Sequence, residues 1–241
     1  MLEKKWLSTA LNARSIGLGT ETIVLAHGFG TDQSVWDKIT PSLVEHYKVV
    51  LFDWPFSGTV DPTLYDPLKY SSMEAFADVL VTLMDQMDLK AITFVGHSMY
   101  LNTDDYEGGF TSSDVEQFLQ NIESNYDNWV DAFSLLAVDP NDEPSVNKFR
   151  EFLGRMRAGV AVSLAKTVFY SDYRDILEKI ETPCTIIQTT SDIIVPFNVA
   201  LYMERKIKGK VTLEALEAKG HFPQMTACPQ LVDVLKGVIG L

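Results

Sequence analysis

The sequence predicts an α/β fold in which a mostly parallel sheet is flanked by helices. Length and composition agree with this, because 241 residues of which 46% are apolar suit one domain with a sizeable core. Apolar runs typical of buried strands also alternate with helical patterns along the chain. One of these runs, from Ala91 to Val95, leads directly into Gly96-His97-Ser98. A Gly-x-Ser sequence after a strand is typical of a sharp turn that exposes a serine.

The first half of the chain contains three expected strands and the helices between them. The strands are expected at 21–26, 49–52 and 91–95. Short helical stretches are expected at 35–39 and 41–47. A longer helix is expected after Ser71, because Ser71 and Glu74 have the spacing of a capping box and apolar residues then recur at helical intervals through Met87.

The second half contains a helical insertion and then resumes the alternation. Strands are expected at 185–188 and 211–216, and helices at 198–206 and 231–239. The region from 102 to 173 has a helical pattern without strands. We expect it to lie above the C-terminal edge of the sheet, where ligands enter parallel sheets.

Charge excludes one class of partner. A formal net charge of −13 argues against nucleic acid, because phosphate binding needs clustered Lys and Arg. Between Asn102 and Asn147 there are eleven acidic residues and no Lys or Arg. This stretch is either a solvated face or a subdomain that meets a basic partner.

The sequence gives no reason to expect a membrane span, a metal or another cofactor. No run approaches 18 apolar residues, and the N-terminus lacks the apolar stretch of a secretory signal, so we expect a cytoplasmic or nuclear protein. Cys184 and Cys228 are expected to be reduced structural thiols. The four histidines are scattered without metal-ligand spacing.

Three residues that each follow an expected strand are candidates for catalysis: Ser98, Asp192 and His221. A serine hydroxyl is a poor nucleophile until an imidazole accepts its proton, and a carboxylate must hold that imidazole in one tautomer. The order Ser, Asp, His is the one expected for α/β-hydrolases. The N–H groups of Phe29, after the first long strand, and of Met99 are the expected donors of an oxyanion hole.

Two other polar residues compete for these roles. Asp53 also follows a strand, but we place it below Asp192 as the triad acid because it lies upstream of the serine. His97 is expected to pack within the turn rather than act as the base.

The run from Ile23 to Trp36 closely resembles the karrikin/strigolactone-receptor group of α/β-hydrolases of land plants. The resemblance covers nearly the whole chain and is closer to the karrikin-receptor-like branch. Further matches are Tyr70-Ser71-Ser72, Gly96-His97-Ser98, Tyr100-Leu101-Asn102, Asp105-Tyr106, Gly108-Gly109-Phe110, Asn125-Tyr126, Trp129, Phe133, Leu136-Ala137-Val138, Met156-Arg157, Thr167-Val168-Phe169, Ser171-Asp172 and Gly220-His221.

The resemblance implies an α/β-hydrolase fold whose core, 1–101 and 174–241, lies under a lid of four helices within 102–173. It implies an apolar pocket lined by Phe29, Met99, Tyr126, Phe133 and Phe169. Each of these side chains is alternatively an ordinary core residue.

Members of the group bind butenolide-type lactone signals and hydrolyse some of them slowly through the serine. They then engage a leucine-rich-repeat F-box protein and a repressor. We therefore expect a receptor-like serine hydrolase. The alternatives are a general carboxylesterase without a signalling role and a binding-only protein with a disabled triad.

The chain departs from the group at two places. Trp54-Pro55-Phe56 stands where the group has a small, Gly-containing loop. After the serine, the group has a helix and a strand, whereas here Tyr100 begins an acidic, turn-prone stretch without helical periodicity. A helix, a strand and two short loops amount to roughly 25 residues. Either the protein contains a stretch that this sequence lacks, or the chain is a truncated form.

Overall fold

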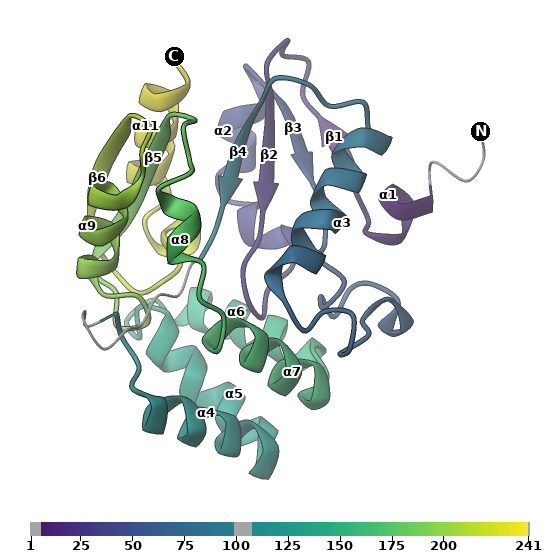
Figure 1. Cartoon of the computed structure of the whole chain (residues 1–241), viewed down its shortest axis with the longest axis vertical. Coiled ribbons are helices and arrows are strands. Elements are labelled where there is room, and N and C mark those ends of the chain that lie inside the picture. Colours follow the sequence, from purple (N-terminus) through teal and green to yellow (C-terminus); the bar gives the residue numbers. More distant parts are fainter. Residues whose placement is uncertain (1–5, 99–107, 241) are drawn as a thin grey trace. The chain divides into compact units, whose positions relative to one another are not determined.

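A mostly parallel sheet organises the first part of the chain in the computed structural model, which describes residues 6–98 and 108–240. Its strands lie in the order β1 (Arg14–Ile16), β3 (Lys48–Leu51), β2 (Thr22–Ala26) and β4 (Ile92–Gly96) (Figure 1). β1 is antiparallel to β3, and the other pairs are parallel. Val24 lies opposite Val50 on one side and opposite Phe94 on the other, so β2 is an interior strand.

The interior strands explain why this sheet forms. All five residues of β2 are buried, as are Val49, Val50 and Leu51 of β3. Uncharged apolar runs of this kind are stable only when both faces of the strand are covered. The expected strands at 21–26, 49–52 and 91–95 are therefore confirmed within one or two residues.

The helices next to this sheet are short, apart from one. The short elements are α1 (Trp6–Ala10), the 3-10 helices η2 (Gln33–Trp36) and η3 (Pro62–Leu64), and α2 (Thr40–Val44). Of these, η2 and α2 correspond to the stretches expected at 35–39 and 41–47 but begin and end earlier. The long helix is α3 (Met73–Gln86), which buries Phe76, Val79 and Leu83 along one face. The capping box predicted at Ser71 is wrong, because Ser72 is the N-cap and the Ser71 hydroxyl donates to the Leu68 carbonyl oxygen at 2.9 Å.

The contacts divide the chain into two compact units. Unit 1 contains residues 1–98 and 149–168, and unit 2 contains residues 99–148 and 169–241. Two helices of the predicted lid, α6 (Glu143–Arg155) and α7 (Ala158–Phe169), contribute to both units. The boundaries predicted for core and lid stay a prediction.

The unit 1 parts of α6 and α7 contact the loops that follow its strands. Arg155 donates to the Asp32 carboxylate at 2.6 Å, and Tyr65 donates to the Ser163 hydroxyl at 3.0 Å. The Thr167 hydroxyl donates to the Tyr70 carbonyl oxygen at 2.9 Å. These helical segments are therefore fixed to the loops of the sheet in unit 1.

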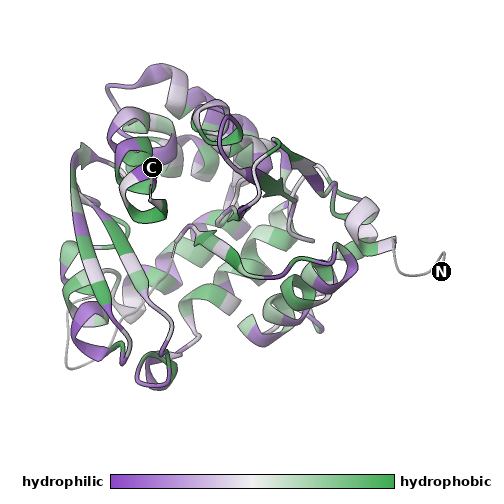
Figure 2. Ribbon diagram, turned by 90° about the horizontal axis from the view of Figure 1, so that it is seen from above, coloured by the Kyte–Doolittle hydropathy of each residue, from purple (hydrophilic) through white to green (hydrophobic). Residues whose placement is uncertain are grey.

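Unit 2 contains two parallel strands, β5 (Cys184–Ser191) and β6 (Val211–Lys219). Its helices include α4 (Ser112–Ser124), α5 (Tyr126–Ala137), α8 (Arg174–Leu177), α9 (Phe197–Lys206), α10 (Pro223–Thr226) and α11 (Cys228–Ile239). The elements expected at 185–188, 198–206, 211–216 and 231–239 are all present, and the strands are longer than expected. Hydrophobic residues, green in Figure 2, recur along the strands and alternate with hydrophilic ones on the helices.

Of the helices in the described part of the chain, none has both the length and the apolar character needed to cross a bilayer.

Candidate active site

Ser98 occupies the sharp turn that follows β4. Its φ angle is +77°, a backbone conformation that residues other than glycine rarely adopt. The His97 N–H donates to the Ala26 carbonyl oxygen at 3.2 Å, which extends the pairing of β2 with β4 up to the residue before the serine. Such a conformation costs about 1–3 kcal/mol and persists where surrounding structure holds it. The exposed Ser98 therefore has the local geometry expected of a nucleophile elbow.

The loop after β2 lies directly against this turn. A Cβ atom on Gly28 would lie 2.6 Å from Nδ1 of His97, 2.9 Å from its carbonyl oxygen and 3.2 Å from Cβ of Ser98. Only glycine permits so close an approach. Phe29, the predicted oxyanion-hole donor, thus follows a residue in contact with the elbow. Met99, the other predicted donor, lies outside the described residues.

His27 anchors the same loop from a buried position. Its Nε2 accepts a hydrogen bond from the Trp54 backbone N–H at 3.0 Å, and its carbonyl oxygen accepts one from the Trp54 indole at 2.8 Å. Burial lowers the pKa of His27, although the nearby Asp53 and Asp32 carboxylates act to raise it. A neutral imidazole suits this position, because a protonated Nε2 would have no lone pair for the Trp54 N–H.

Asp53 is fully engaged in holding loops together. Its carboxylate accepts hydrogen bonds from the Gln33 backbone N–H at 2.8 Å, from the Asn12 side chain at 2.9 Å and from the Thr59 hydroxyl at 2.8 Å. Three donors from three segments give this buried carboxylate a structural role. The contacts support the lower rank that the sequence gave Asp53 as a triad acid.

In unit 2, Asp192 and His221 form a hydrogen-bonded pair. Oδ2 of Asp192 lies 2.7 Å from Nδ1 of His221. Oδ1 accepts from the backbone N–H groups of Ile194 at 2.8 Å and Val195 at 3.0 Å. Burial acts to raise the pKa of Asp192, but the hydrogen bonds from His221 and the two backbone donors hold it below its ordinary value. An ionised Asp192 favours the tautomer of His221 that carries its proton on Nδ1 and its lone pair on Nε2.

Two polar residues on β5 support this pair, and neither of them was singled out from the sequence. The Gln188 amide donates to the Val195 carbonyl oxygen at 3.0 Å and lies 3.4 Å from Oδ2 of Asp192. The Thr189 hydroxyl donates to the Gly220 carbonyl oxygen at 2.8 Å. Both side chains are buried in a strand, where a polar residue in an apolar run is the only hint of such a role.

The end of α5 positions the loop that carries His221. The His221 N–H donates to the Ala137 carbonyl oxygen at 2.7 Å, and Val138 forms a β-bridge with Gly220. Gly220 has a φ angle of +85°, and a Cβ there would lie 2.8 Å from the Asp139 nitrogen. A segment of the predicted lid therefore forms part of the support of the candidate base.

Three of the predicted pocket residues belong to one aromatic cluster in unit 2. Phe118 is its centre, with ring centroids 5.1 Å from both Phe133 and Phe169 and 5.4 Å from Trp129. Tyr126 stacks on Trp129 at 5.4 Å. Burial, and to a smaller extent the Asp127 carboxylate, raises the pKa of Tyr126 and so favours its neutral hydroxyl. The cluster provides an uncharged aromatic wall built from α4, α5 and the end of α7.

The fold, the elbow at Ser98 and the Asp192–His221 pair define an α/β-hydrolase. Residues 21–99 match the family model described as the alpha/beta hydrolase fold. The chain is 34% identical over 254 residues to strigolactone esterase D14 of Arabidopsis thaliana, covering 94% of this chain and 95% of the relative. It is 33% identical over 257 residues to karrikin insensitive 2 receptor IA of Petunia hybrida, covering 95% and 94%. The chain therefore belongs to the strigolactone- and karrikin-receptor family of α/β-hydrolases.

A solved structure supports the same fold. The hydrolase olei00960 from Oleispira antarctica is 27% identical and superposes with a TM-score of 0.89, with 97% of each chain covered. The predicted α/β-hydrolase fold is thus confirmed. The two family branches match with nearly equal identity, so these percentages do not separate them.

Proposed function

We propose that this receptor-like hydrolase binds a small butenolide-type lactone and hydrolyses it slowly through Ser98, His221 and Asp192. The observation that carries the proposal is the 2.7 Å hydrogen bond between Oδ2 of Asp192 and Nδ1 of His221, which orients the imidazole as the triad mechanism requires. The strained backbone at Ser98 and the names of the relatives, one of which is a strigolactone esterase, support it. The location we propose is the cytoplasm and the nucleus.

The proposed reaction is acyl transfer in two steps. Oγ of Ser98 attacks the lactone carbonyl carbon while Nε2 of His221 accepts its proton, and the N–H groups of Phe29 and Met99 bind the developing oxyanion. The ring C–O bond then breaks, and the proton passes from His221 to the departing oxygen. Water, deprotonated by His221, attacks the acyl-enzyme in the second step and regenerates the serine.

The proposed ligand site is apolar. Phe29, Met99, Tyr126, Phe133 and Phe169 line it in this proposal, and the aromatic cluster in unit 2 supports the last three. Aromatic side chains suit a flat, uncharged lactone, because they offer a large contact area at low entropic cost. The receptor role adds an F-box protein with leucine-rich repeats and a repressor as partners.

Ester hydrolysis tests the catalytic part of the proposal. We expect slow turnover of a chromogenic acetate ester, reduced by about a thousandfold or more in Ser98→Ala. Circular dichroism of the variant checks that it is folded. Equal rates for Ser98→Ala and the unchanged chain would favour a binding-only protein.

Ligand-dependent stability tests the receptor part. A synthetic butenolide lactone should change the melting temperature and promote capture of the F-box protein, while turnover stays slow. Fast hydrolysis of many simple esters with no partner captured would instead favour a general carboxylesterase.

A further inference from the structure

Phe29, the proposed oxyanion donor in the loop after β2, lies between two glycines that are each packed tightly. Before it, a Cβ atom on Gly28 would lie 2.6 Å from Nδ1 of His97, in the elbow. After it, Gly30 has a φ angle of +72°, and a Cβ there would lie 2.5 Å from Cδ2 of Leu153, on α6. Only glycine permits such close approaches. The elbow therefore fixes the backbone on one side of Phe29, and α6 fixes it on the other.

An ion pair joins the same loop to the end of α6. Nη2 of Arg155, the last residue of α6, donates to Oδ2 of Asp32 at 2.6 Å. The Asp32 side chain is only 6% exposed. Cζ of Arg155 lies 5.2 Å from the ring centroid of Phe152, one turn earlier on the helix, so the ring also holds the guanidinium. A hydrogen bond between two charged groups is shorter and stronger than a neutral one, and this one fixes the loop to α6.

The other carboxylate oxygen of Asp32 organises the loop itself. Oδ1 accepts hydrogen bonds from the Ser34 backbone N–H at 2.9 Å and from the Ser34 hydroxyl at 2.6 Å, so Asp32 caps η2. One carboxylate thus joins the turn that follows Phe29 to the guanidinium of Arg155. A displacement of Arg155 would move this carboxylate and the turn together.

A second loop fixes the backbone of Arg155. A Cβ on Gly58, in the loop after β3, would lie 2.6 Å from both Cβ and the carbonyl oxygen of Arg155. The position of Arg155 is therefore set before its guanidinium reaches Asp32. Residues 28–34, 58, 97 and 152–155 all belong to unit 1, so these contacts lie within one compact body.

We propose that Arg155 is a positioning residue for the oxyanion hole: through Asp32, it holds the loop after β2 in the conformation that directs the Phe29 N–H at the oxyanion. An oxyanion donor must lie about 2.7–3.1 Å from the oxygen on which charge develops, and losing one donor costs about 10²–10³-fold in kcat. A displacement of about 1 Å alone can cost about 100-fold. This proposal rests on the proposed function, because it takes Phe29 as a donor.

Steady-state ester hydrolysis tests the role of Arg155. Arg155→Met keeps an unbranched apolar side chain beside Phe152 but removes the charge. We expect kcat for a chromogenic acetate ester to fall by about 10–100-fold, with KM changed by less than about twofold, because Arg155 touches neither the substrate nor the reacting atoms in this proposal. Arg155→Lys keeps the positive charge and should restore kcat to within about threefold of the unchanged chain.

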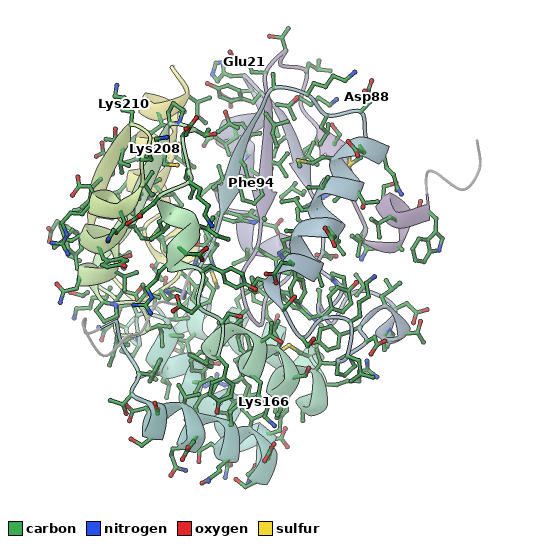
Figure 3. All side chains as sticks on the ribbon, viewed as in Figure 1. Glu21, Asp88, Phe94, Lys166, Lys208 and Lys210 are labelled. Carbon is green, nitrogen blue, oxygen red and sulfur yellow. The ribbon has the colours of Figure 1, made fainter. Side chains whose placement is uncertain are left out.

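Two basic residues nearby provide controls. Arg157 donates to the Pro62 carbonyl oxygen at 2.8 Å, in a different loop. Arg157→Met should therefore leave kcat unchanged even if the melting temperature falls. Lys166→Met, at an exposed position of α7 (Figure 3), should change neither quantity.

A double-variant cycle tests the route through Asp32. Asp32→Asn keeps the oxygen that caps η2 but loses the charge that binds Arg155. It should lower kcat about as much as Arg155→Met does, and the two changes combined should lower kcat by no more than about twofold further. Losses that multiply in the double variant would show that Arg155 acts by another route and would overturn the proposal.

Hydrogen exchange provides a measurement that does not need turnover. The amides of residues 29–31 should exchange at least about tenfold faster in Arg155→Met than in the unchanged chain, and Arg157→Met should not change them. If the unchanged chain hydrolyses the ester no faster than Ser98→Ala, the proposed function fails, and faster exchange in Arg155→Met alone still supports the link between Arg155 and the loop.

Three results would contradict the positioning role. Unchanged exchange in Arg155→Met would show that the ion pair does not hold the loop. Equal losses of kcat in Arg155→Met and Arg157→Met would limit Arg155 to general stability. A higher KM with unchanged kcat would assign Arg155 to ligand binding instead.

Discussion

Two loops that carry candidate functional residues, the loop after β2 in unit 1 and the loop after β5 in unit 2, are held in different ways. Next to the elbow, the loop after β2 is held by neutral contacts: the buried imidazole of His27, the indole of Trp54 and the absence of a side chain at Gly28. Charged groups hold only its far end, where Arg155 binds the Asp32 carboxylate. The loop after β5 depends on a charged group, the carboxylate of Asp192, which binds His221 and two backbone N–H groups. Steric fit therefore fixes the loop after β2 next to the elbow, and ionic hydrogen bonding fixes the loop after β5.

The largest effect on activity should come from a change at Asp192, in the loop after β5. Asp192→Asn should lower kcat by about 10³–10⁴-fold, because an amide favours the wrong tautomer of His221. Steady-state ester hydrolysis measures it. Asp175→Asn is the matched control, since Asp175 is exposed and its carboxylate forms a surface ion pair with Lys179 at 2.7 Å. A loss below tenfold in Asp192→Asn would show that Asp192 does not orient the base.

In the loop after β2, the position whose substitution should lower stability most is Gly28. Gly28→Ala should destabilise the protein by about 2–3 kcal/mol, because the added Cβ would meet His97 at 2.6 Å. Gly154→Ala provides the control within the same unit, since nothing lies within 4 Å of its Cβ. That change should stabilise helix α6 by about 0.5–1 kcal/mol. Urea unfolding of both variants compares them, and a neutral Gly28→Ala would disprove the close packing.

A substitution of Trp54 should have a smaller effect on the loop after β2. Trp54→Phe keeps the ring but removes the indole donor to the His27 carbonyl oxygen, which should cost about 1–2 kcal/mol. If the indole positions the oxyanion loop, kcat should fall by about tenfold with little change in KM. Trp6→Phe, at an exposed tryptophan, should leave both stability and kinetics unchanged. A drop in stability with unchanged kcat would limit Trp54 to packing.

The smallest expected effect is a dependence of folding stability on pH, which His27 causes. The pKa of His27 is lowered in the folded state, so the unfolded chain binds the proton more readily. The contribution of His27 to stability is thus fully present above its ordinary pKa of 6.5 and is lost as the pH falls below that value. Urea unfolding between pH 7 and pH 5 measures the slope, which His27→Asn should reduce and His46→Gln, on the surface, should not.

The sequence predicted the parts that depend on local chemistry. The uncharged runs of β2 and β3 were sufficient to predict these two strands, and Gly96 before Ser98 was sufficient to predict the sharp turn after β4, because short-range geometry requires those residue types. The tertiary contacts that hold these loops in place could not be predicted. The Trp54–His27 contacts join residues that are adjacent only in the folded chain, and the interaction between Ala137 and His221 joins segments 84 positions apart in the sequence.

The capping box illustrates a different limit. Ser71 and Glu74 have the right spacing, but the helix begins one residue later, with Ser72 at the N-cap position without a side-chain capping bond, and the Ser71 hydroxyl donates to the Leu68 carbonyl oxygen. Two neighbouring serines offer two registers one residue apart, and local propensity does not choose between them. The placement of Ser98, His221 and Asp192 in one triad stays a prediction.

The hydrogen bond between His221 and the end of α5 links ligand preference to turnover rate, two properties that selection would otherwise adjust separately. Phe133, which we propose as a residue of the ligand site, shares helix α5 with Ala137, whose carbonyl group holds the His221 loop. Under this proposal, a substitution that shifts the helix to fit a new ligand also displaces the candidate base. Divergence toward new signals in this lineage should therefore be accompanied by changes in turnover rate, and variants that alter one without the other should be concentrated away from α5.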